Sequence, residues 1–82
     1  PRQNLPRTTE DQRIGLTIQR LRELHGISQE QLAQAIDVGR ATLAHYERGT
    51  RRLSYERIQH IAWALHEPAE AIALRPALEH AA

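Results

Sequence analysis

Two short helical segments separated by a three-residue break constrain the fold of this sequence more than any other feature. Ser28 and Gln31 have the spacing of a capping box, which predicts a helix over residues 29–36. Residues 37–39, Asp-Val-Gly, interrupt the helical pattern, and a second helix is predicted over about residues 39–48. Each cap contributes on the order of 1 kcal/mol, so these boundaries are expected to be sharp. The sequence therefore predicts a pair of short helices joined by a tight turn.

Longer helical patterns flank this pair on both sides. One helix is predicted to begin near Thr8 or Thr9 and to end at Gly26, because apolar positions recur one turn apart at Ile14, Ile18, Leu21 and Leu24 or His25. A second is capped by Ser54 and has an apolar stripe made of Ile58, Ile61, Ala62 and Leu65. Pro68 suits the first turn of a further short helix, through residue 72 or 74. No segment alternates with the period of a strand, so the predicted class is all-α.

The length of the chain, 82 residues, allows one small hydrophobic core and therefore one domain. We expect a flexible N-terminal arm over residues 1–8, a folded domain over 9–75 and a tail over 76–82. The sequence contains no cysteine, which excludes disulfides and thiolate zinc sites. It has no apolar run long enough to span a bilayer and no signal-peptide pattern at its start, so we expect a cytoplasmic location.

The distribution of charge is more informative than its sum. The formal net charge is only +1, but every basic residue is an arginine, whose planar guanidinium suits phosphate and guanine. Arg48, Arg51 and Arg52 lie close together where the chain leaves the second short helix. In residues 67–79, by contrast, most of the charged residues are acidic. One end of the domain is therefore predicted to face an anion.

The spacing of the two short helices fits insertion of the second one into the major groove of DNA, which is about 12 Å wide. Ala33 is small enough for the two helices to approach closely, and Leu43 supplies an inward contact. The side of the second helix that is expected to face outward carries Arg40, Ala41, Ala44 and His45.

Beyond this spacing, the sequence from Ile14 to Ile72 resembles the Cro/repressor-type (xenobiotic-response-element) helix-turn-helix family. The residues that carry the resemblance are Arg22, Ser28-Gln29, Leu32-Ala33, Leu43 and Glu47-x-Gly49. The resemblance implies a compact, lambda-repressor-like bundle of about five helices with its helix-turn-helix over residues 28–49. It also implies that Gln29 binds a phosphate and that Arg22 and Glu47 form a structural ion pair. Asp37, Gly39 and Leu53 depart from the usual glycine, serine and proline of the family.

The recognition helix is thus predicted over residues 40–48, with Arg40 as the main contact to a base, because a guanidinium can bond both acceptors of guanine. Ala41 and Ala44 are small enough to contact a thymine methyl group, and His45 can donate to a base or a phosphate. The residues predicted to contact double-stranded DNA are Gln29, Gly39, Arg40, Ala41, Thr42, Ala44, His45, Arg48, Thr50, Arg51 and Arg52. The alternative for each charged position is a solvated surface side chain.

Trp63 has two possible roles, because it lies off the apolar stripe of its helix. It either packs under the C-terminal helix or marks a protein interface, where a homodimer would place two recognition helices on a palindromic operator. The sequence accordingly suggests two functions: a dimeric, sequence-specific transcriptional regulator, of the repressor or Cro type, or an antitoxin-like module that binds a partner protein. His25, His60, His66 and His80 lack the spacing of a metal site, and no catalytic motif or cofactor site is present.

Overall fold

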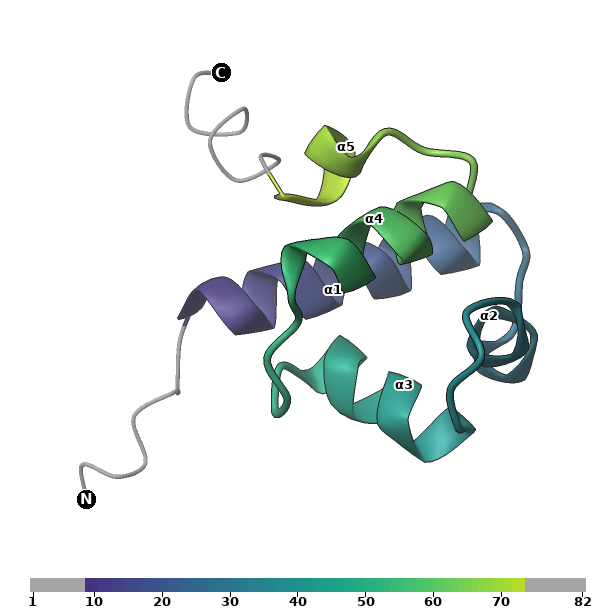
Figure 1. The fold of residues 1–82 in the computed structure, drawn as a ribbon, viewed down its shortest axis with the longest axis horizontal. Helices are drawn as coiled ribbons and strands as arrows, with labels where there is room; N and C mark the ends of the chain where they lie inside the picture. Colours follow the sequence, from purple (N-terminus) through teal and green to yellow (C-terminus); the bar gives the residue numbers. More distant parts are fainter. Residues whose placement is uncertain (1–8, 74–82) are drawn as a thin grey trace.

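The computed structural model describes residues 9–73, and within this range the chain folds into five helices (Figure 1). They are α1 (Thr9–Leu24), α2 (Gln29–Ala35), α3 (Arg40–Arg48), α4 (Tyr55–Ala64) and α5 (Ala69–Ala73). The predicted arm over residues 1–8 and the tail over 76–82 lie outside the described residues. The all-α prediction is confirmed, and none of the helices in residues 9–73 is long and apolar enough to cross a membrane.

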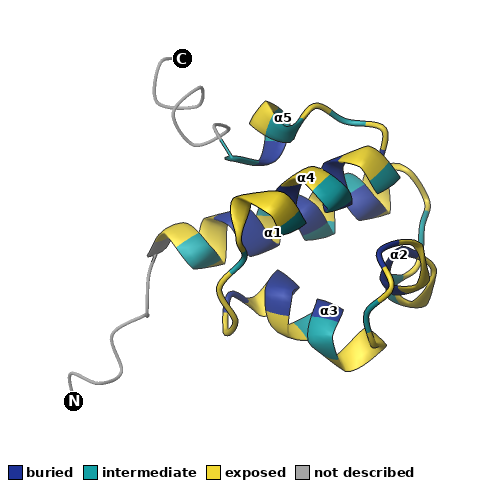
Figure 2. Cartoon of the chain, viewed as in Figure 1, coloured by how far each residue is buried: buried dark blue, intermediate teal, exposed yellow. Residues whose placement is uncertain are grey.

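The helices surround one core, with α1 packed against both α3 and α5. Figure 1 shows α3 and α5 on opposite sides of the layer that contains α1 and α4, while α2 is seen nearly end-on beside α3. The core receives side chains from every helix: Ile14, Ile18, Leu32, Ala33, Ile36, Leu43, Tyr46, Ile58, Ile61, Ala62, Leu65 and Ile72. Figure 2 shows that the outer side of α3 remains exposed to solvent, so this helix has one buried and one free side.

The apolar stripe predicted for the first helix is wrong at its end. Leu24 is 78% exposed, whereas Arg22 is buried. The reason is the helical period: the position one turn after Ile18 on the inward side is Arg22, and Leu24 lies outside the buried side of the helix. The inward position is thus occupied by a charged residue, which requires a partner inside the domain.

The turn between α2 and α3 forms without a glycine at its left-handed position. Asp37 has φ 62° there, a left-handed conformation that aspartate tolerates better than most residues. The backbone N–H of Val38 donates to the carbonyl of Ala33 at 3.0 Å, which closes the end of α2. Gly39 is the N-cap of α3 and supplies no side-chain hydrogen bond, whereas Ser28 forms the predicted capping box at the start of α2.

Helices α1 and α3 approach each other closely at Gly15, a residue that no pattern in the sequence singled out. A Cβ atom at this position would lie 2.3 Å from the carbonyl oxygen of Tyr46 and 2.5 Å from that of Glu47. Both oxygens belong to the backbone of α3, so they cannot rotate away as a side chain would. The absence of a side chain at Gly15 therefore sets the distance at which α3 packs on α1.

Candidate nucleic-acid interface

A buried ion pair fixes α3 to α1. Arg22 Nε donates to Glu47 Oε2 at 2.7 Å, and Arg22 Nη2 donates to Glu47 Oε1 at 3.2 Å. The two residues are only 8% and 7% exposed, so this bidentate pair is largely removed from water. It is the ion pair that the family resemblance implied, and it occupies the inward position at the end of α1.

The same pair positions Gln29 at the start of α2. Gln29 Nε2 donates to Glu47 Oε1 at 2.9 Å, and Arg22 Nη1 donates to the carbonyl of Ile27 at 2.8 Å, just before the helix. One amide hydrogen of Gln29 is not used by this bond. A shallow surface depression here is lined by Arg22, Ser28, Gln29, Glu30 and Arg40. The predicted phosphate contact and the predicted base contact therefore line the same depression, and Glu30 places one carboxylate beside them.

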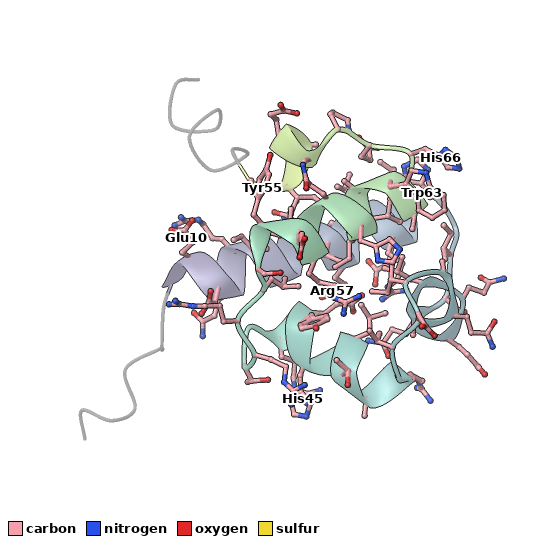
Figure 3. The ribbon with its side chains drawn as sticks, viewed as in Figure 1. Glu10, His45, Tyr55, Arg57, Trp63 and His66 are labelled. Atoms are coloured by element: carbon pink, nitrogen blue, oxygen red, sulfur yellow. The ribbon has the colours of Figure 1, made fainter. Side chains whose placement is uncertain are left out.

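The exposed side of α3 carries no negative charge. Its exposed residues are Arg40, Ala41, His45 and Arg48, and Thr42 and Ala44 are partly exposed. The buried residues of α3 are Leu43, Tyr46 and Glu47, so the one carboxylate of this helix is inside the domain and paired with Arg22. Figure 3 shows His45 pointing away from the body of the protein. This side of α3, which we call the recognition face, is thus neutral or basic and unobstructed.

At the C-terminal end of the recognition face, two side chains contact His45. His45 Nδ1 lies 2.8 Å from Thr50 Oγ1 and 3.4 Å from Arg48 Nη2. Gly49, with φ 77°, ends α3 and turns the chain so that Thr50 reaches back to His45. The structure therefore brings together three of the residues predicted to contact DNA.

Arg51 and Arg52 follow in the loop before α4, and both are exposed. Arg52 lines a surface depression that also contains Glu10 and Asp11 from the first turn of α1. Arg51 does not line that depression. The two arginines consequently differ in surroundings, a distinction that their adjacency in the sequence did not indicate.

Arg57 has a structural role that the sequence analysis missed. Its Nη1 donates to the carbonyl of Ile36 at 3.1 Å, which links α4 to the C-cap of α2. Figure 3 shows the Arg57 side chain extending from α4 toward the centre of the molecule. No spacing rule could have identified it, since the contact joins residues far apart in the sequence.

Trp63 does not pack beneath the C-terminal helix, because it is 69% exposed. Its ring lies 5.9 Å from that of His60, measured between centroids. Figure 3 places Trp63 beside His66, at the far end of α4 from the α3–α4 loop. Of the two roles considered for this residue, packing under the C-terminal helix is wrong, and the interface stays a prediction. Within residues 9–73, no three histidines, cysteines or carboxylates are grouped to hold a metal ion.

Comparisons with known proteins agree with this geometry. A family model described as helix-turn-helix matches residues 18–71. The clp gene regulator ClgR from Corynebacterium glutamicum superposes with a TM-score of 0.81 at 23% identity, covering 89% of this chain and 94% of that chain. The restriction-modification controller protein C.AhdI from Aeromonas hydrophila gives 0.76 at 29% identity, covering 79% and 98%. No sequence among curated proteins matches the chain.

Proposed function

The chain belongs to the Cro/repressor-type helix-turn-helix family of DNA-binding domains, and from this premise we propose that it is a sequence-specific transcriptional regulator. The observation that carries the proposal is the recognition face of α3, from which the only carboxylate of the helix is withdrawn into a buried ion pair. A helix with a free, neutral or basic side suits the major groove, where the DNA backbone is negative on both sides. The family is one of DNA-binding domains and not of enzymes.

Arg40 is proposed as the main contact to a base. It is exposed at the first turn of α3, the end that enters the groove in proteins of this architecture. Its guanidinium can donate to O6 and N7 of a guanine at once. Ala41, Thr42 and Ala44 have short side chains, which allow α3 to come close to the bases. Each is therefore proposed to contact DNA.

Phosphate contacts are proposed on either side of the recognition face. Gln29 is held at the start of α2 with one amide hydrogen to donate, and the backbone N–H of Gly39 lies at the N-cap of α3. Arg48, Arg51 and Arg52 are exposed beyond the other end of α3. These contacts would supply affinity on any sequence and would set the register for Arg40 and His45.

We further propose that the protein acts as a homodimer on a palindromic operator. Two recognition helices related by a two-fold axis meet half-sites about 34 Å apart, which is one turn of DNA. Trp63, exposed on α4, is the residue proposed for a protein interface. Occupation of an operator by such a dimer is the simplest basis for repression.

Selection of bound sites from a randomised duplex library tests this function, with the wild-type chain and Arg40→Ala used in parallel. The wild type should enrich an inverted repeat, and Arg40→Ala should lose about tenfold or more of the preference at one base pair in each half-site. Light scattering of the complex should give two chains per repeat. An unchanged preference at every position in Arg40→Ala would remove this arginine from the base contacts.

The second candidate function is a module that binds a different protein, as an antitoxin does, with DNA binding secondary. The exposure of Trp63 is the observation that favours it. Co-purification of another protein in a fixed ratio, lost in Trp63→Ala, would support this function. Tight binding of the isolated wild-type chain to a palindrome supports the first function instead.

A further inference from the structure

The hydroxyl group of Thr50 contacts His45 on the recognition face. Its Oγ1 lies 2.8 Å from His45 Nδ1 and 3.3 Å from the carbonyl oxygen of His45. The backbone N–H of Thr50 already donates to that carbonyl at 3.0 Å. Thr50 is thus linked to His45 by three contacts, although it is one of the residues predicted to contact DNA.

Two hydrogen-bonding groups, from Thr50 and Arg48, lie near His45 Nδ1. Arg48 Nη2 lies 3.4 Å from His45 Nδ1 and can only donate a hydrogen bond. The Thr50 hydroxyl is closer to the same nitrogen, at 2.8 Å. Two donors facing one nitrogen favour its lone pair as the acceptor. The His45 carbonyl, the other possible acceptor for the hydroxyl, is farther away and already occupied.

We propose that Thr50 is a positioning residue: its hydroxyl donates to His45 Nδ1, the neutral ring carries its hydrogen on Nε2, and His45 is thereby held as an outward hydrogen-bond donor that selects an acceptor edge in the major groove. This inference rests on the proposed function and specifies the chemistry of one base contact within it. Guanine presents two acceptors, N7 and O6, whereas cytosine presents the N4 donor. At the base pair beneath His45, guanine on the contacted strand is favoured and cytosine is rejected.

The test combines site selection with variants of matched shape. Thr50→Val replaces the hydroxyl with a methyl group and should reduce the guanine preference at that one pair about fivefold to tenfold. His45→Ala should abolish the same preference, and the double variant should be no worse than His45→Ala alone. Thr50→Ser keeps the hydroxyl and should restore the preference. Arg51→Ala is the control, because loss of a phosphate contact weakens binding on all sequences and reduces the salt slope.

A second measurement needs no DNA. Long-range correlation of the imidazole nitrogens by NMR should show hydrogen on Nε2 of His45 in the wild type and Thr50→Ser, and a mixture of both tautomers in Thr50→Val. Wild-type hydrogen on Nδ1 would overturn the proposal, as would a Thr50→Val protein that behaves like Arg51→Ala. A wild-type chain that selects no DNA sequence would overturn the proposed function together with the base contact. Hydrogen on Nδ1 in a wild-type chain that does select a sequence would overturn the positioning role of Thr50 alone.

Discussion

Replacing Gly15 by alanine is expected to destabilise the domain by about 3 kcal/mol or more, because overpacking between two backbones has no rotamer to relieve it. The added Cβ would meet the carbonyl oxygens of Tyr46 and Glu47 at 2.3 and 2.5 Å. Either α3 must move away from α1, or the helices must separate. Such a loss is a large part of the 5–15 kcal/mol that typically stabilises a protein.

Thermal unfolding followed by circular dichroism measures this effect. Gly39→Ala is the matched control, since a Cβ there meets nothing within 4 Å and its φ of −75° suits any residue. We expect the control to lose at most about 1 kcal/mol, because alanine is a poorer N-cap than glycine, and Gly15→Ala to unfold far below the control or to be unfolded at 25 °C. Equal unfolding temperatures for Gly15→Ala and wild type would show that the contact between α1 and α3 is not as tight as described.

Replacing Glu47 by leucine is the second change with a large expected effect. It leaves the guanidinium of Arg22 buried without its carboxylate, which typically destabilises a protein by about 3–5 kcal/mol. The double variant Arg22→Met with Glu47→Leu removes both charges and should recover much of this stability, because apolar residues of similar volume can replace a buried pair. Urea denaturation of the two variants and the wild type measures the difference.

The double variant should recover stability without recovering DNA binding. Gln29 donates to Glu47 Oε1, so the double variant lacks the acceptor that positions Gln29 at the start of α2. We expect it to fold but to bind DNA more weakly than wild type on every sequence, since a phosphate contact is affected. Wild-type stability in Glu47→Leu would contradict the role of the ion pair, and wild-type affinity in the folded double variant would contradict the role of Gln29.

Much of the fold could be predicted because its signals are local. The caps Ser28 and Ser54 bond to backbone N–H groups three positions ahead, at Gln31 and Arg57, as their spacing indicated. Gly26 and Gly49 have φ 70° and 77°, the conformation that ends a helix and favours glycine. These features depend on neighbouring residues alone, so the positions of the helices follow from the sequence.

The features that the sequence did not reveal depend on contacts between distant residues. Gly15 has a function only because Tyr46 passes beside it, and Arg57 because the end of α2 lies within reach of its side chain. Trp63 could not be assigned to the core or the surface without the position of α5. In the candidate interface, the residues on the outer side of α3 followed from helical period, but the engagement of Thr50 with His45 depends on the turn at Gly49.

The central claim is that the recognition face of α3 contacts DNA, and titration of the isotope-labelled chain with its selected duplex tests it most directly. We expect the largest changes in amide chemical shift over residues 39–52 and at Gln29. Changes concentrated on the outer side of α4 around Trp63, with α3 unaffected, would contradict the account.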